Sequence, residues 1–368
     1  MQESNAGTVN RIPSLDGLRT VSILLVIVSH FQFFIGVPDT FNFGSLGVRV
    51  FFVISGFLIT GLLVKELDKT TTVNLPKFYF RRTFRIFPPF YFYLFVILLL
   101  SVIGWLETPL LSFVPAFTYT SNYVHLNAWN LNHSWSLAVE EQFYLIYPGV
   151  LLLLGKRKTV WLLGLLIIVS PFVRILDFHL FNHIDAVWIT KGFHANADAL
   201  AVGCLLAHGR DFLHQSRFYS RILNSGLMIF APLLIVFANA QADHPHVLLG
   251  VSMSLCSLLI ALCLDWAVTY HDDNKIGKIL NSKPMVTLGV MSYSIYLWQQ
   301  PFSNHQTPAW FTAFPCNLIG IAFAGAFSYF VVEKYSLKWR QKLEKHWFSA
   351  DAKQPGESFS TATVRRES

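Results

Sequence analysis

The sequence predicts an all-α integral membrane protein with about ten transmembrane helices and both termini in the cytoplasm. Of its 368 residues, 53% are hydrophobic and 13% are charged, whereas a soluble domain carries roughly 25% charged residues. The mean hydropathy is +0.46, and long apolar runs recur along the chain. The net charge of +7 comes from basic residues in the loops between these runs. This pattern indicates contact with membrane lipids and argues against a nucleic-acid partner.

Ten apolar windows match or approach the length needed to cross a bilayer, about 17 to 25 residues of helix. We interpret the first as a spanning helix rather than a cleaved signal, because it is too long and lacks a small-residue cleavage motif. The sixth is shorter than ideal. The windows are residues 18–37, 46–64, 89–106, 135–154, 159–176, 194–208, 223–240, 247–269, 285–303 and 310–332.

The basic residues predict the orientation of these helices. An even number of spans places both termini on one side of the membrane. Assigning that side to the cytoplasm leaves only Arg49, Arg174 and Lys191, of 28 Lys and Arg residues, outside or near the outer ends. Such an excess of basic residues is typical of cytoplasmic loops. Residues 107–133 are nearly apolar enough to cross, but an eleventh span would reverse every later loop, so we predict an outer re-entrant or interfacial segment there.

The chain is predicted to consist of a short lead over residues 1–10, one transmembrane domain over 11–335 and a basic cytoplasmic tail over 336–368. This tail is predicted to be disordered, because its end beyond about Trp347 is polar and lacks apolar periodicity. We see no soluble catalytic domain, so any chemistry is expected within the helical bundle or its loops.

The cysteines and histidines give no sign of a metal site. All cysteines fall inside apolar runs without metal-ligand spacing, and no histidine pair has the HExxH pattern. We therefore interpret the cysteines as small buried residues. They are Cys204, Cys256, Cys263 and Cys316.

Arg19 and His30 lie in the first apolar run, with the histidine deep inside it. Eleven residues of α-helix advance about 16 Å and rotate three turns plus roughly 20°, which places both side chains on one helix face. An ionisable group at this depth is costly and indicates a functional site facing protein or a wet cavity. The alternative is an interfacial anchor at Arg19 and a hydrogen-bonded core histidine.

A basic segment precedes the third apolar window. Lys77, Arg81 and Arg85 follow one another at intervals of four residues, and Arg82 lies beside them on a helical wheel. Guanidinium groups bind phosphate oxygens bidentately, which predicts a phosphate-binding platform at the membrane. An interfacial helix held by anionic lipid headgroups would show the same pattern.

The fourth window carries a polar stripe of Ser136, Glu140 and Tyr144 at intervals of four residues. Glu140 is expected roughly 6 to 9 Å from the outer helix end. A carboxyl group at this depth is either paired or functional. The alternative to a functional role is a structural hydrogen bond or ion pair, with Arg49 as a candidate partner.

Other polar residues in the apolar windows are weaker indications. Asn196 and Asp198 near a helix end are more typical of a cap or an interhelical contact. Glu333 is expected at the cytoplasmic end of the last window, in an anchoring or capping position. A further polar face in the ninth window comprises Ser292, Tyr296 and Gln299.

Five segments, taken in order, resemble the bacterial acyltransferase-3 family of integral membrane acyltransferases over residues 11–335. The first resembles the family's motif of Arg or Lys, ten residues and then His. The second and third resemble its second-helix and Arg-x-x-Arg motifs, and the fourth and fifth resemble its later signature segments. Gln299 stands where members often have His, and the residues after Glu333 lack the Pro that often follows the family's glutamate. The segments are LDGLRTVSILLVIVSHF, GVRVFFVISGFLIT, RRTFRIFPP, HSWSLAVEEQFYLIYP and MSYSIYLWQQP.

The resemblance implies a ten-helix enzyme of the bacterial inner membrane. Such an enzyme takes an acyl group, often acetyl, from cytoplasmic acyl-CoA and delivers it to a hydroxyl of a carbohydrate, lipid-linked glycan or other envelope acceptor. Acyl-CoA is then a donor substrate, and no permanently bound cofactor is expected. Some members carry a further soluble esterase-like domain, so we expect this chain to complete the transfer alone or with a separate periplasmic partner.

The same resemblance assigns roles to individual residues. His30 is implied to be catalytic with Arg19 as its motif partner, and Arg82 and Arg85 to hold the acyl-CoA phosphates. Glu140 occupies the position of the signature carboxylate, which we also assign to catalysis. The other residues that we assign to substrate binding are Trp135, Ser136 and Glu333.

Two mechanisms and two other classes of protein remain open. His30 could deprotonate an acceptor hydroxyl for direct attack, or become acylated and pass the group on. A transporter or flippase for a lipid-linked glycan would also have ten helices and buried polar groups, but should tolerate loss of the Arg-x-x-Arg pair. A structural or sensor protein should tolerate His30→Ala.

Overall fold

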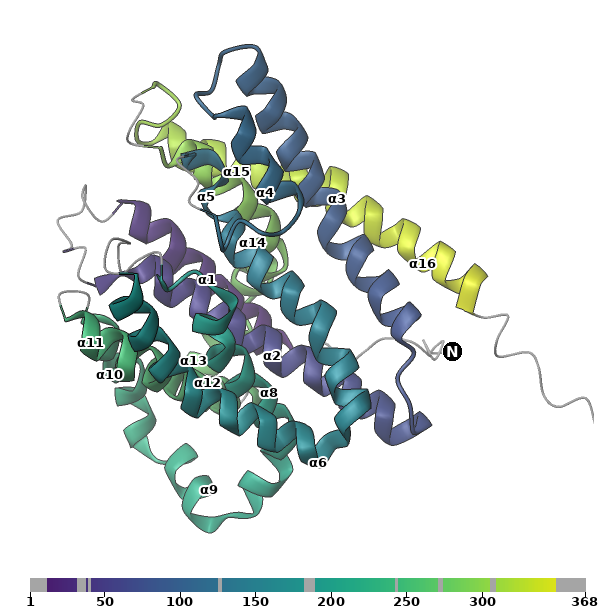
Figure 1. Ribbon diagram of the computed structural model, residues 1–368, viewed down its shortest axis with the longest axis vertical. Helices are drawn as coiled ribbons and strands as arrows, with labels where there is room; N and C mark the ends of the chain where they lie inside the picture. The colour runs from purple at the N-terminus through teal and green to yellow at the C-terminus, as the bar shows by residue number, and fades with distance from the viewer. Residues whose placement is uncertain are drawn as a thin grey trace, which may run out of the picture.

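A computed structural model describes residues 12–31, 38, 41–124, 128–181, 189–241, 244–270, 274–304 and 309–348. Every regular element in these residues is helical, which confirms the predicted all-α class, and the long helices form one bundle (Figure 1). The elements are α1 Pro13–Phe31, α2 Phe43–Thr70, α3 Leu75–Val102, η2 Leu110–Ser112, α4 Phe113–Phe117, α5 Trp129–Asn132, α6 Ser134–Leu180, α8 Phe193–Gln215, α9 Arg217–Leu223, η3 Gly226–Phe230, α10 Ala231–Asn239, α11 Pro245–Val247, η4 Leu248–Ser252, α12 Met253–Thr269, α13 Lys275–Leu280, α14 Lys283–Phe302, α15 Cys316–Phe327, η5 Ser328–Glu333 and α16 Lys334–Phe348.

Helical elements occur in all ten predicted windows, but they do not amount to ten long apolar helices. Among the described residues, six helices are long and apolar enough to cross a membrane, or seven if the bent pair α9 and η3–α10 counts as one span. The α6 element contains two predicted windows. Its helix is interrupted between them at Gly155, whose φ of +70° lies outside the helical region. The protein is thus a multi-pass membrane protein, while ten spans stay a prediction.

The centre of the bundle is built on close approaches between helices. A Cβ atom at Gly56 of α2 would overlap the carbonyl oxygen of Leu200 on α8, and one at Gly203 of α8 would overlap that of Val53 on α2. Glycines permit such backbone proximity in membrane bundles. Helix α2 also packs against α1, which in turn packs against α14. These four helices form the core around which the site is arranged.

Helix α3 begins at a side-chain cap and carries the basic segment inward from there. Asn74 accepts a hydrogen bond from the backbone N–H of Lys77 at 2.9 Å, and a proline lies in the first turn. Such residues are favourable at helix N-termini. The short elements η2, α4 and α5 in the region 107–133 are far too short to cross a bilayer.

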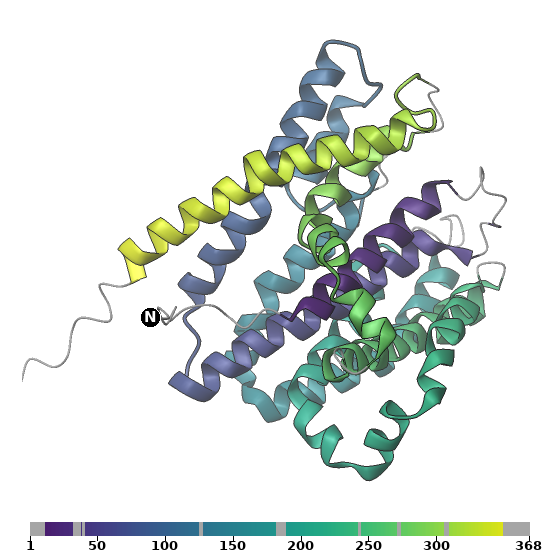
Figure 2. The same ribbon diagram turned by 180° about the vertical axis from the view of Figure 1, so that it is seen from behind.

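Helix α16 crosses the N-terminal half of α3, as seen from behind in Figure 2. The rings of Phe80 and Trp347 lie 5.4 Å apart, and the Ser336 hydroxyl donates to the Phe84 carbonyl oxygen at 2.5 Å. The predicted disorder is therefore wrong for residues 336–348, because aromatic contacts with α3 support a helix there. Residues 349–368 lie outside the described residues.

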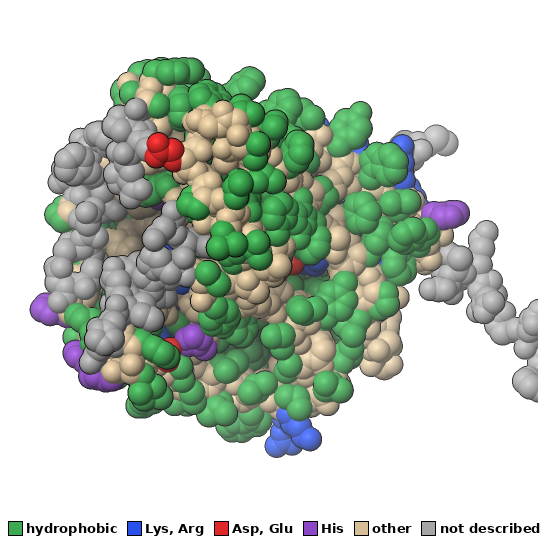
Figure 3. All heavy atoms as spheres, turned by 45° about the horizontal axis from the view of Figure 1, so that its top comes forward, with side chains coloured by type: hydrophobic (Ala, Val, Ile, Leu, Met, Phe, Trp, Pro, Cys, Tyr) green, Lys and Arg blue, Asp and Glu red, His purple; other side chains and the backbone are tan. Residues whose placement is uncertain are grey.

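Large apolar side chains are exposed over much of the molecule. In Figure 3 hydrophobic side chains are spread widely over the visible face, with few charged groups among them. Examples from three helices are Phe95, Leu153 and Phe323, which are 61%, 86% and 74% exposed. Such surface would be unfavourable in water and fits contact with lipid.

Candidate functional site

A cavity opens between α1, α2, α3, α6 and α14. Its empty volume is about 690 Å³, including its open mouth. Aromatic and aliphatic side chains, such as Phe51 and Val48, line part of the wall. The polar residues of the wall are Arg19, Ser55, Arg82, Arg85, Ser136, Glu140, Tyr144, Ser292, Tyr293 and Tyr296.

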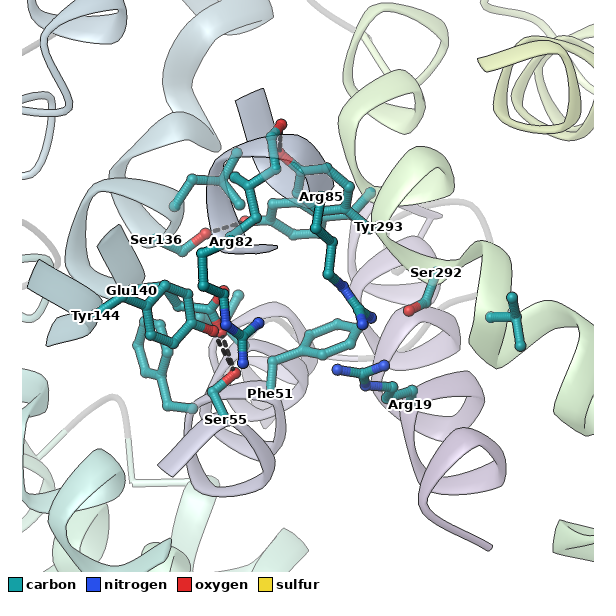
Figure 4. A pocket seen from close by; sticks show the side chains of 16 residues that line it. Arg19, Phe51, Ser55, Arg82, Arg85, Ser136, Glu140, Tyr144, Ser292 and Tyr293 are labelled. Atoms are coloured by element: carbon teal, nitrogen blue, oxygen red, sulfur yellow. Dashed lines mark hydrogen bonds between the residues drawn. The ribbon is translucent and has the colours of Figure 1, made fainter. Parts of the chain in front are cut away.

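Three guanidinium groups converge on this cavity. Arg19 comes from α1, and Arg82 and Arg85 come from one face of α3, three residues apart. In Figure 4 the guanidinium groups of Arg19 and Arg85 point toward one another across the cavity. That of Arg82 lies 4.6 Å from the centre of the Tyr144 ring. The three positive charges that face one cavity repel each other. The arrangement therefore suits an anion with several oxygens.

Glu140 is the carboxylate of the cavity wall. It accepts a hydrogen bond from the Ser55 hydroxyl at 2.6 Å, and Tyr144 donates to that same hydroxyl at 3.1 Å. The suggested partner Arg49 is wrong, because Arg49 lies 3.5 Å from Asp198 in a different cluster. Glu140 instead acts as a partial counter-charge to the arginines of the cavity.

The basic residues of α3 fall into two groups with different surroundings. Arg82 and Arg85 line the cavity, whereas Lys77 and Arg81 form ion pairs with Glu344 of α16, the first at 3.7 Å. The predicted four-residue pattern therefore does not form one platform. The tertiary position of α16 determines which basic groups reach the cavity.

Two predicted substrate-binding residues lie beside the cavity rather than on its wall. The Trp135 ring packs edge-on against Phe52, with centroids 6.1 Å apart. Glu333 is buried at the end of η5 and accepts a hydrogen bond from Ser294 at 2.8 Å. The guanidinium of Arg85 is within electrostatic reach of the Glu333 carboxylate. Glu333 can thus offset part of the positive charge of the arginine cluster, although it does not line the cavity.

Ser136, by contrast, lines the cavity as part of a hydroxyl pair. Its hydroxyl lies 2.6 Å from that of Tyr296 on α14. Each of the two hydroxyls lies 3.1 Å from the backbone carbonyl oxygen of His133. These contacts connect the cavity wall to the start of α6.

His30 is not among the residues that line the cavity. It lies near the carboxyl end of α1, eleven residues from Arg19, or about 16 Å along the helix. Its ring packs edge-on against Trp129, with centroids 5.5 Å apart, and the Trp129 indole N–H donates to the Gln300 carbonyl oxygen at 2.8 Å. The predicted catalytic histidine therefore lies outside the arginine cavity.

A second buried cluster joins α2, α6, α8 and α12. Asp198 accepts hydrogen bonds from Arg174 at 2.9 Å and from Ser254 at 2.6 Å. Arg49 lies 3.5 Å from the same carboxylate and donates to Ser257 at 3.0 Å. The two arginines and Asp198 are at most 3% exposed. The interhelical-contact interpretation of Asp198 is thus confirmed, because buried charges of this kind must be paired.

Sequence reasoning missed two residues of this region. Ser55 lies in an apolar run and gives no signal of its own until Glu140 is placed beside it. His133 received no role from the sequence, yet its side chain is buried, with 5% exposure. Its position two residues before Trp135, at the start of a recognised motif, was the signal available.

The chain belongs to the protein family described as "Acyltransferase domain", which it matches over residues 12–341. The resemblance inferred from its five motifs is confirmed. It is 30% identical over 314 residues to "O-acetyltransferase OatA" of Staphylococcus aureus, covering 79% of this chain and 50% of that protein. It is 28% identical over 333 residues to "Peptidoglycan O-acetyltransferase OatA" of Listeria monocytogenes, covering 81% and 50%. The chain spans about half the length of these curated relatives, and no solved structure matches.

Proposed function

We propose that the protein is a membrane O-acyltransferase that moves an acetyl group from acetyl-CoA to a hydroxyl of a cell-wall carbohydrate. The cavity with its three arginines carries this proposal, since acyl-CoA is a polyanion. The names of two relatives support the acetyl group, and one of these names specifies peptidoglycan. Other acyl groups would need a differently shaped pocket for the acyl chain.

The donor is proposed to bind with its phosphates at Arg19, Arg82 and Arg85. Guanidinium forks form charge-assisted hydrogen bonds with phosphate oxygens, and three of them offset the cost of removing those charges from water. The thioester lies at the far end of the pantetheine arm from the phosphates. A separation of about 16 Å along α1 between Arg19 and His30 suits an extended donor whose two ends occupy different places.

Two routes for the transfer step fit this placement. In the first, His30 takes the proton of the acceptor hydroxyl, whose oxygen attacks the thioester carbonyl while the thiolate of CoA leaves and is protonated. In the second, the His30 imidazole displaces CoA, and the acceptor hydroxyl then displaces the imidazole. The second route lets donor and acceptor occupy the site one after the other.

We propose a location in the bacterial cytoplasmic membrane, with ten spans and both termini inside. This orientation places the basic loops and the start of α3 on the side where acyl-CoA is present. Arg82 and Arg85 lie seven and ten residues after the start of α3, within reach of a donor that enters from the cytoplasm. His30, at the other end of α1, then lies nearer the outer face.

Acetyl-CoA binding to the protein in lipid nanodiscs tests this function. Arg82→Ala/Arg85→Ala should raise the Kd at least tenfold, equivalent to about 1.4 kcal/mol, because two phosphate contacts are lost. The matched control is Arg81→Ala, which changes an arginine on the same helix that pairs with Glu344 instead. His30→Ala should bind acetyl-CoA within twofold of the wild type but fail to transfer acetyl.

Absence of saturable binding to acetyl-CoA, succinyl-CoA and free CoA in the wild type would contradict the proposed donor. An equal loss of affinity in Arg81→Ala and in the double variant would contradict the assignment of the phosphates to the cavity.

A further inference from the structure

His133 is a buried histidine whose ring has no hydrogen-bond partner among the described residues. Its side chain is 5% exposed, and neither Nδ1 nor Nε2 is paired. Buried side-chain nitrogens are almost always hydrogen-bonded, by protein or by a bound group. An imidazole left without a partner on both nitrogens therefore indicates a ligand that arrives from outside the chain.

The neighbours of His133 cannot satisfy its ring. Tyr93 and Tyr296 present their rings to it edge-on, with centroids 5.3 Å and 5.4 Å away. The Tyr93 hydroxyl donates to the Asn130 carbonyl oxygen at 2.5 Å. The Tyr296 hydroxyl lies against Ser136 and the His133 backbone carbonyl. Both phenol hydroxyls thus have other hydrogen-bond partners, and their rings hold the imidazole in place without hydrogen-bonding to it.

His133 lies between the arginine cavity and His30. On one side its ring contacts that of Tyr296, which lines the arginine cavity. On the other, His30 is within electrostatic reach of His133. The Trp129 ring, which packs against His30, belongs to the short helix directly before His133. A group bound at His133 would therefore lie beside the proposed catalytic histidine.

The chemistry of the unpaired ring restricts the kind of ligand. A neutral imidazole has one nitrogen that donates and one that accepts. The carbonyl of a thioester can only accept hydrogen bonds, so it would leave one nitrogen unpaired. A hydroxyl both donates and accepts, and a carbohydrate carries several hydroxyls close together.

We propose that His133 binds the hydroxyl-bearing acceptor and orients it beside His30. This inference rests on the proposed acyltransferase function and adds the residue that holds the carbohydrate. No covalent bond forms at His133 in either transfer route. Its contribution is to hold the acceptor hydroxyl where His30 or an acylated His30 can meet it.

The test uses the full chain in lipid nanodiscs, with radiolabelled acetyl-CoA as donor and soluble peptidoglycan fragments as acceptor. His133→Phe keeps a flat ring but removes both nitrogens. It should bind acetyl-CoA within twofold of the wild type, while its KM for the fragments rises at least tenfold. His133→Gln retains one donor and one acceptor and should recover part of this loss. His179→Phe, at an exposed histidine, is the matched control and should behave as the wild type.

An unchanged KM for the fragments in His133→Phe, with transfer within threefold of the wild type, would overturn this inference and leave the proposed function intact. If His133→Phe no longer binds acetyl-CoA, His133→Leu replaces it with a smaller apolar side chain under the same criteria. A wild type that neither binds acetyl-CoA nor transfers acetyl would instead remove the proposed function, and the inference with it.

Discussion

At the scale of residues, the cavity combines three arginines with one carboxylate. Arg19 and Arg82 both act electrostatically on Glu140, whose hydrogen-bond partner is Ser55. This leaves a net positive charge for an anionic donor. The carboxylate opposes donor binding by simple repulsion, so its presence on the wall indicates a role other than holding the donor.

Replacing Glu140 separates donor binding from transfer. Glu140→Gln keeps a hydrogen-bond acceptor for Ser55 but removes one negative charge from the cavity. We expect acetyl-CoA to bind about two- to tenfold more tightly, up to about 1.4 kcal/mol, while the transfer rate falls at least tenfold. Titration and single-turnover assays in nanodiscs measure both quantities.

The control for this change is Glu107→Gln, which alters an exposed carboxylate outside the helices and should affect neither quantity. Weaker acetyl-CoA binding in Glu140→Gln would show that the carboxylate supports the arginines structurally rather than opposing the anion.

At the scale of elements, helix contacts decide which side chains reach the cavity. Lys77 and Arg81 pair with Glu344 of α16, whereas Arg82 and Arg85, further along the same helix, line the cavity. The approach of α2 to α8 has a similar effect, since it fixes the α2 face that carries Ser55. Substitutions at these contacts should therefore shift the side chains of the cavity, although the substituted residues do not line it.

Gly56→Ala tests the contact between α2 and α8. Its added methyl group would overlap the Leu200 carbonyl oxygen, so the helices must separate. We expect a cost of about 1–3 kcal/mol in folding free energy, as for other overpacked cores, and a lower thermal midpoint in detergent.

Gly61→Ala is the matched control on the same helix, because its added methyl group would meet no atom of another helix within 4 Å. It should leave the thermal midpoint unchanged or raise it, since Ala favours helix over Gly by up to about 1 kcal/mol. Equal midpoints for the two variants would show that the helices are not in close contact at Gly56.

At the scale of the whole molecule, the orientation in the membrane determines how donor and acceptor reach the site. The proposed topology places residues 107–133 outside and the loop around α13 inside. Five predicted spans separate these regions, so they lie on opposite sides only if the number of crossings between them is odd.

Cysteine labelling tests that topology. A membrane-impermeant maleimide should label Tyr123→Cys in intact cells, because this exposed position is predicted to lie outside. Lys278→Cys, also exposed, should be labelled only after the membrane is permeabilised. The unsubstituted protein gives the background from its four cysteines. Labelling of both positions on the same side would contradict ten spans in this arrangement.

Much of the fold and part of the site could be predicted from the sequence. Hydropathy, helical periodicity and capping residues are local properties, so they predicted helices throughout and a membrane environment. The spacing of Arg82 and Arg85 placed them on one helix face, and both line the cavity. The motifs identified the family before any contact was known.

The tertiary structure decided how these local features combine. It separated Lys77 and Arg81 from the cavity and ordered residues 336–348 through contacts with α3. It paired Arg49 with Asp198 rather than with Glu140. It also buried His133 between the cavity and His30. The sequence alone determined which residues are apolar or charged and where most of the helices lie, because those properties depend on the residue itself and on its neighbours in the chain. Which of them meet depends on packing between distant segments, and only the folded bundle specifies it.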